Sequence, residues 1–127
     1  MKRSAPLRKL SREHHTALSL AQRIAKATGP EEQNALLAAI PPSFREGLER
    51  HFQVEEKGLL RQLTQLGETA LVARALAEHA QLRVLAAAIG AGKVDALAPF
   101  GALLKTHVHF EEGELYAVAE ERLYAAD

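Results

Sequence analysis

Four histidines and two glutamates in this sequence have the residue types and the spacing of metal ligands. His51 is followed four residues later by Glu55, and His107 is followed in the same way by Glu111. Residues four apart are rotated by about 40° around an α-helix, so each pair projects side by side from one helix face. The two remaining histidines are single, and each lies in a segment of its own. The six candidate ligands are His14, His51, Glu55, His79, His107 and Glu111.

This ligand set indicates a transition metal. Imidazole and carboxylate groups suit iron, manganese or zinc, whereas calcium and magnesium prefer oxygen ligands alone. The chain has no cysteine, so nitrogen and oxygen must supply every ligand. Buried imidazoles and carboxylates are unfavourable unless a partner compensates them, and a metal pair would compensate all six. Because bundle cores with such ligands usually hold two metals bridged by carboxylates, we predict a two-metal centre.

Glycine and proline residues divide the chain into long segments in which apolar residues recur at spacings of three and four. These breakers are Gly29-Pro30, Pro41-Pro42, Gly67, the run from Gly90 to Gly92, and Pro99. We predict long helices over residues 7–28, 43–66, 68–89 and 95–123, and a shorter helix over residues 31–40. A histidine lies on the apolar stripe of each long helix, which indicates that all four histidines face one core.

The second and fourth long segments repeat one another. The matching residues are Phe44, Leu48, His51, Glu55, Glu56 and Leu59 in one segment and Phe100, Leu104, His107, Glu111, Glu112 and Leu115 in the other. The first and third segments share a shorter repeat, the dipeptide Glu-His, at Glu13-His14 and Glu78-His79. The sequence therefore predicts two pseudo-symmetric hairpins in an all-α, up-down-up-down four-helix bundle, with a short extra helix between the first and second long helices.

The length of 127 residues fits one domain, with residues 1–6 as a flexible N-terminal tail and residues 7–127 as the bundle. The 16 basic and 16 acidic residues cancel, so no long-range field attracts the protein to nucleic acid or to anionic lipid. The basic N-terminus is not followed by the apolar run of a signal peptide or a membrane span. We therefore expect a cytoplasmic protein without a nucleic-acid or membrane partner.

The order of the motifs from His14 to Glu111 resembles the hemerythrin-like family, also called the HHE cation-binding domain. That family places a single His, an HxxxE pair, another single His and another HxxxE pair on four helices. The resemblance implies a non-haem di-iron centre, bridged by oxo or hydroxo groups and by carboxylates, in which zinc or manganese could substitute for iron. It also implies binding of dioxygen or a related small ligand, such as nitric oxide or peroxide, in oxygen or redox sensing or in iron homeostasis.

The sequence leaves two alternatives to this binding function. One is a di-iron oxidase or peroxidase-like enzyme, although no Gly-rich phosphate loop or nucleophile signature identifies a further substrate. The other is a metal-free helical interaction module.

Two features depart from the oxygen-carrying hemerythrins. Those proteins carry HxxxH on the third helix, where this chain has His79 and Arg83, and arginine is not a metal ligand. They also place the fourth-helix acid five residues after its histidine, where this chain offers Glu111 at four and Glu112 at five. With bridging carboxylates and four histidines, each iron keeps an accessible position. This favours oxidation, peroxide reactions or ligand sensing over reversible oxygen carriage.

Neighbours of the candidate ligands have roles that the sequence leaves open. His15 is rotated by about 100° from His14 and is assigned to the surface or to a supporting role, but it replaces His14 if the register differs. Arg83 either pairs with a site carboxylate or bound anion or is solvated at the bundle edge. Glu56 and Glu112 are either boundary charges or hydrogen-bond partners of a ligating histidine.

Five further residues receive simple structural interpretations. Glu13 and Glu78 are expected to be charges on the helix surface. Tyr116 lies nine residues after His107, half a turn out of phase, so it is expected to pack rather than to enter the site. The phenylalanines at the starts of the two repeats are expected to form apolar walls beside the site.

Overall fold

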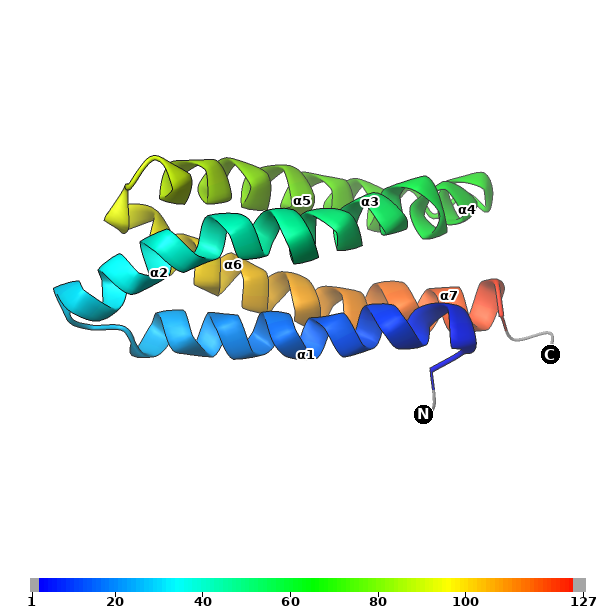
Figure 1. Cartoon of the computed structure of the whole chain (residues 1–127). Helices are drawn as coiled ribbons and strands as arrows, with labels where there is room; N and C mark the ends of the chain where they lie inside the picture. The colour runs from blue at the N-terminus through cyan, green and yellow to red at the C-terminus, as the bar shows by residue number, and fades with distance from the viewer. Residues whose placement is uncertain (1–2, 125–127) are drawn as a thin grey trace.

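The structure, a computed structural model, describes residues 3–124, which form four antiparallel helical rods (Figure 1). The first rod is α1, Ala5–Lys26. The second contains α2 (Pro30–Ser43), the π-helical turn η1 (Phe44–Leu48), α3 (Glu49–Lys57) and α4 (Leu59–Gln65). The third is α5, Thr69–Gly90. The fourth contains the 3₁₀ turn η2 (Val94–Ala96), α6 (Leu97–Phe110), the π-helical turn η3 (Glu111–Leu115) and α7 (Tyr116–Arg122).

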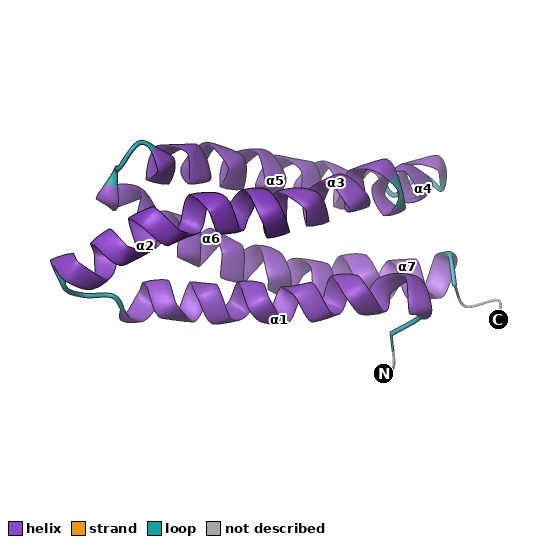
Figure 2. Cartoon of the chain, in the orientation of Figure 1, coloured by secondary structure: helices purple, strands orange, loops and turns teal. Residues whose placement is uncertain are grey.

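Between residues 3 and 124 the chain contains helices, turns and short loops but no strand (Figure 2). Successive rods run in opposite directions along the bundle (Figure 1). The predicted all-α, up-down-up-down bundle is therefore confirmed. Within the same residues, no helix combines the length and the apolar composition needed to cross a bilayer.

The second rod differs from the prediction at its two prolines. The extra helix is present as α2, but the break expected at Pro41-Pro42 does not occur, and α2 passes directly into η1 and α3. Each proline lacks an amide donor for the helical hydrogen bonds. The chain nevertheless stays helical, and the π-helical turn η1 follows the prolines in place of a loop. Leu36 and Ile40 are buried on the core side of α2, and this burial favours a continuous helix across the prolines.

The described chain begins inside the segment predicted as a flexible tail. α1 starts at Ala5, and the Ser4 amide donates hydrogen bonds to both carboxylate oxygens of Glu120, at 3.1 and 3.2 Å. Residues 1–2 of that tail and residues 125–127 of the predicted bundle lie outside the described residues.

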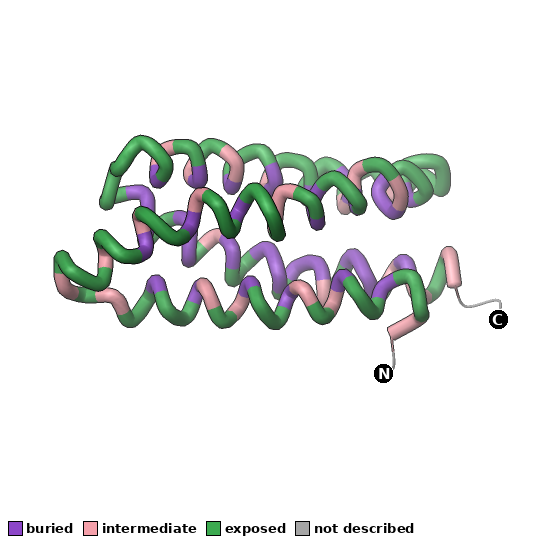
Figure 3. The backbone as a smooth tube through the Cα atoms, viewed as in Figure 1, coloured by how far each residue is buried: buried purple, intermediate pink, exposed green. Residues whose placement is uncertain are grey.

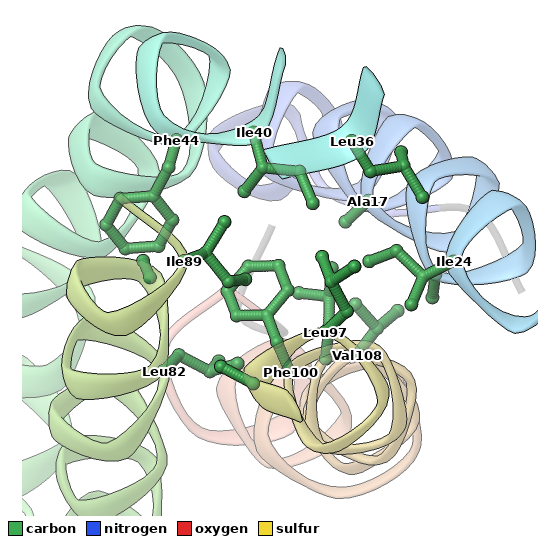
Figure 4. Close-up of a cluster of buried hydrophobic side chains, with 14 of the residues drawn as sticks. Ala17, Ile24, Leu36, Ile40, Phe44, Leu82, Ile89, Leu97, Phe100 and Val108 are labelled. Carbon is green, nitrogen blue, oxygen red and sulfur yellow. The ribbon is translucent and has the colours of Figure 1, made fainter. Parts of the chain in front are cut away.

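Two apolar clusters fill the bundle, on either side of a band of buried polar residues. In α1, Leu10 belongs to one cluster and Ala17 to the other, and the buried His14 lies between them. α5 repeats this order around His79. Figure 4 shows the cluster that contains Ala17, in which Phe44 and Phe100 face the aliphatic side chains of neighbouring rods. The buried positions line the inner faces of the rods (Figure 3), so the polar band is enclosed by apolar packing.

Candidate metal centre

The structure brings all six candidate ligands together in the polar band. Every one of them is at most 3% exposed. The apolar stripe of α1 turns His14 inward, whereas His15 is exposed, which is the register that the sequence favours. The set is His14 from α1, His51 and Glu55 from α3, His79 from α5, His107 from α6 and Glu111 at the start of η3.

The ligand atoms fall into two groups that share both carboxylates. One group contains His14 and His51, the other contains His79 and His107, and Glu55 and Glu111 belong to both. Within each group the ligand atoms lie within 4.8 Å of one another. Each pair of histidines therefore comes from two different rods.

Each carboxylate presents one oxygen to each group. Glu111 Oε1 lies 2.9 Å from His14 Nε2, and its Oε2 lies 3.2 Å from His107 Nε2. Glu55 Oε2 lies 3.4 Å from His51 Nε2, while its Oε1 lies 3.1 Å from His79 Nε2. This is the arrangement that carboxylates bridging two cations require.

Five of the converging atoms are buried without a hydrogen-bond partner. They are His51 Nε2, His79 Nε2, His107 Nε2, Glu55 Oε1 and Glu111 Oε2. A buried polar atom without a partner is destabilising and is rare in native proteins, so a cluster of five calls for a partner between them. A pair of cations would supply that partner, and the donor set therefore fits a two-metal centre.

Each histidine also contacts a glutamate from a neighbouring rod through its other ring nitrogen. The Nδ1 atoms pair as His14 with Glu112 at 2.6 Å, His51 with Glu13 at 2.8 Å, His79 with Glu56 at 2.8 Å and His107 with Glu78 at 2.7 Å. A carboxylate only accepts, so each Nδ1–H donates to its glutamate and each Nε2 is directed to the interior, where it can bind a metal once it carries no proton. The contacts run from rod to rod and close a ring around the bundle. We call these four residues the outer glutamates.

The comparison with known protein families agrees with this geometry. Residues 5–119 match the hemerythrin HHE cation binding domain. The chain belongs to this family. Among curated proteins and solved structures, no match to the chain was found. The family match indicates a cation-binding domain, and the two groups of His and Glu side chains could hold the metal.

The outer glutamates change two expectations for this HHE domain. Glu13 and Glu78 were expected to be surface charges; Glu13 is indeed 41% exposed and Glu78 is 13% exposed, but each also accepts a hydrogen bond from a buried histidine, which the expectation did not include. For Glu56 and Glu112, the structure selects the hydrogen-bonding alternative. The signal in the sequence was their recurrence: one acid precedes each single histidine, and a second acid follows the glutamate of each HxxxE pair.

Tyr116 lies inside the HHE site, which the sequence interpretation missed. It is fully buried, its hydroxyl donates a 2.6 Å hydrogen bond to Glu55 Oε2, and its ring stacks on His14 with centroids 5.3 Å apart. The cause is η3, because a π-helical turn aligns residues five apart and so brings Tyr116 over Glu111. Burial and the nearby carboxylates raise the pKa of Tyr116, so the phenol keeps its proton.

Aromatic rings form an apolar wall beside the site, as predicted. Phe44 and Phe100 are buried, with ring centroids 6.1 Å apart. Phe52, which the sequence did not single out, stacks on His79 with centroids 4.0 Å apart and planes 16° from parallel. This stacked contact restricts the rotation of the His79 ring.

Arg83 occupies the position of the additional histidine of oxygen-carrying hemerythrins and is directed outward. Its guanidinium donates to Glu49 at 2.8 and 2.9 Å and to Glu56 at 3.0 and 3.2 Å. Of the alternatives left open by the sequence, Arg83 thus pairs with carboxylates, and one of them is the outer glutamate of His79. The hydrogen bonds to Arg83 lower the pKa of Glu49, and they also help to lower that of Glu56 against the effect of burial.

Without metal, the site carboxylates keep protons on nearby histidines. Burial alone would favour neutral imidazole, but the nearby carboxylates of Glu111 and Glu55 outweigh it and raise the pKa of His51 to about 11. The same balance raises the pKa of His79 to about 9. For Glu111, burial opposes the charged form, but the four histidines hold the pKa of this carboxyl well below its usual range. Metal binding must therefore displace protons.

Proposed function

We propose that this HHE domain holds two iron ions, one between His14 and His51 and the other between His79 and His107. Glu55 and Glu111 bridge the two ions. The observation that supports this proposal is that each carboxylate directs one oxygen to each pair of histidines. Five of these converging nitrogen and oxygen atoms are buried without a hydrogen-bond partner. Zinc or manganese accepts the same ligands and could substitute.

We further propose that the centre binds dioxygen or a related small ligand, such as nitric oxide or peroxide, in redox sensing or iron homeostasis. Iron supplies electrons and Lewis acidity for that chemistry when it is bound. Two imidazole nitrogens and two carboxylate oxygens face each metal position, so an ion that accepts about six ligands keeps room for an oxygen bridge and an external ligand. Arg83 pairs with Glu49 and Glu56, and among residues 3–124 no further His, Cys, Asp or Glu joins either ligand group.

A peroxidase-like or oxidase activity is the second candidate, and Tyr116 favours it. Its protonated phenol lies 2.6 Å from Glu55 Oε2 and 3.4 Å from Glu111 Oε1, inside the apolar enclosure. There it can hold a proton next to the reacting ligand. Sustained peroxide consumption with retained metal would favour the enzyme, whereas reversible binding of the ligand without turnover would favour the sensor or carrier.

The test is the metal content per chain, measured by elemental analysis, with optical spectra before and after anaerobic reduction and azide addition. We expect about two irons per chain and the absorption of an oxygen-bridged pair, both lost when His79 is replaced by alanine. His109→Ala is the matched control, because His109 is exposed and outside both ligand groups. One metal or none per chain in protein grown with ample iron would refute the two-metal centre, and none would leave a metal-free helical module.

A further inference from the structure

A groove of about 410 Å³ runs along α1 and ends at the candidate metal centre. Its other wall is formed by the end of α2, by η1 and by His51 of α3. The two rods that flank it can be followed in Figure 1. The volume is within the range of small-molecule sites in proteins, about 300–1,000 Å³.

The residues that line the groove differ from its inner end to its outer end. Its inner end is the Glu13–His51 pair, joined by the 2.8 Å hydrogen bond. Ala17, Leu20 and Leu48 line the middle with apolar surface. Arg23 lies at the outer end, ten residues after Glu13 on α1, which corresponds to about 15 Å along a helix.

The charges of the groove favour an anion at its outer end. Within residues 3–124, no carboxylate lies within ion-pair distance of Arg23, and no lysine and no other arginine lines the groove. Glu13 at the inner end is already engaged by His51. Hydroxyl groups of Thr16, Ser19 and Ser43 add hydrogen-bond donors between the two ends.

We propose that this groove binds a small molecule with an anionic group on a short apolar body, such as a medium-chain carboxylate. The carboxylate pairs with Arg23, and the body lies along Ala17, Leu20 and Leu48. The far end of the molecule reaches the Glu13–His51 pair. Binding itself requires no metal. When metals occupy the centre, the bound molecule changes it through His51, and this part of the proposal rests on the proposed function.

The test is equilibrium dialysis of radiolabelled hexanoate against the protein as purified and against the chelator-treated protein. We expect saturable binding of about one hexanoate per chain, and Arg23→Gln should weaken it by about tenfold. Arg12→Gln is the matched control, because Arg12 is exposed on the same helix and does not line the groove. Hexan-1-ol, which has the same body without the charge, should bind at least tenfold more weakly.

A second pair of variants tests the groove by its volume and leaves its charges unchanged. Gly47 lines it within η1, and a Cβ atom added there meets nothing within 4 Å. Gly47→Leu should therefore fold and abolish hexanoate binding, with folding checked by circular dichroism. Gly113→Leu is its counterpart in η3, with equally open surroundings and no place in the groove, and should leave binding unchanged.

The outcomes separate the two proposals. Equal weakening by Arg23→Gln and Arg12→Gln, equal loss in both glycine variants, tight binding of hexan-1-ol or absence of saturable binding would overturn the groove site. Metal content measured in the same samples tests the centre independently. Hexanoate that binds to protein which, grown with ample iron and not treated with chelator, holds fewer than two metals per chain would retain the groove and refute the centre. Hexanoate that binds without changing the spectrum of the iron-loaded protein would refute the response through His51.

Discussion

At the scale of single residues, the candidate site depends on how the two nitrogens of each histidine are used. The outer glutamates accept from Nδ1 at 2.6 to 2.8 Å, so every Nε2 is directed inward, where its lone pair can bind a metal once its proton is displaced. A carboxylate in this position also makes the imidazole a stronger donor to a metal. The outer glutamates therefore belong to the site, although they lie outside both groups of candidate ligands.

Replacing Glu78 by glutamine tests this role. Glutamine keeps the shape and can still accept from His107 Nδ1 through its amide oxygen, but it loses the negative charge that makes the imidazole a stronger donor to a metal. We expect metal affinity to fall by about 10- to 100-fold, measured by competition with a chelator of known affinity. Glu114→Gln is the control, because both acids contact Arg74, at 3.1 and 3.6 Å, but only Glu78 contacts a histidine. Equal affinity in both variants would argue against the role.

Replacing Tyr116 by phenylalanine keeps the stacked ring and removes the donor to Glu55 Oε2. Because this carboxylate is buried, we expect the chelator-treated protein to lose about 1–3 kcal/mol in its free energy of unfolding, measured with urea. The loss should be smaller with metal bound, since a cation also satisfies the carboxylate. Tyr124→Phe should have little effect, because the Tyr124 hydroxyl makes no hydrogen bond to the described residues.

At the scale of elements, the two π-helical turns break the symmetry of the repeat. η1 lies before His51 in the second rod, whereas η3 begins at Glu111, after His107, in the fourth. In the second rod, the helix is instead interrupted at Gly58, three residues after Glu55. A tyrosine therefore reaches the centre from the fourth rod, next to His14.

Deleting Gly113 tests the importance of the π-helical turn. The deletion should restore the α-helical period and leave Tyr116 and Ala119 close to their present orientation, because a π-helical turn holds one more residue than the α-helical turn that replaces it. We therefore expect the fold and the bound metal to be retained, measured by circular dichroism and elemental analysis. Gly113→Ala keeps the length and should raise the free energy of unfolding by about 0.5–1 kcal/mol, because the added Cβ meets no atom within 4 Å. Loss of metal after the deletion would refute the interpretation of η3 as a one-residue insertion that sets the phase of Tyr116.

At the scale of the whole molecule, metal and protons compete for one site between four rods. The raised pKa values of His51, about 11, and His79, about 9, stabilise the metal-free fold fully below the unfolded pKa of 6.5. This contribution is lost as the pH rises toward 9 and 11. The lowered pKa of Glu111 acts in the opposite sense, because its contribution is present above 4.5 and is lost as the pH falls through the folded value.

We therefore expect the chelator-treated protein to become less stable between pH 6.5 and pH 9, measured as its midpoint of urea unfolding. Addition of metal near pH 7.5 should release protons into a weakly buffered solution, since the histidines must lose theirs to bind. Metal retention should decrease as the pH is lowered, because protons then compete for the same nitrogens. A metal-free protein that gains stability from pH 6.5 to pH 9 would contradict this balance.

The sequence by itself determined the features that depend on the local helical period. The apolar stripes placed four helices and selected His14 over His15, and the spacing of four put each HxxxE pair on one face. The same motifs indicated the family, which the match over residues 5–119 confirms. That the six residues bind metal stays a prediction.

The tertiary structure alone decided which groups meet across the rods. It paired His14 with His51 rather than with another histidine, and it directed Glu13 and Glu78 onto histidines of neighbouring helices. The local period cannot specify such pairs, because they depend on how rods distant in the sequence pack against one another. Tyr116 was missed for a related reason. A single π-helical turn shifts the phase of every residue after it, and burial of the apolar face, rather than a recognisable motif, stabilises that turn.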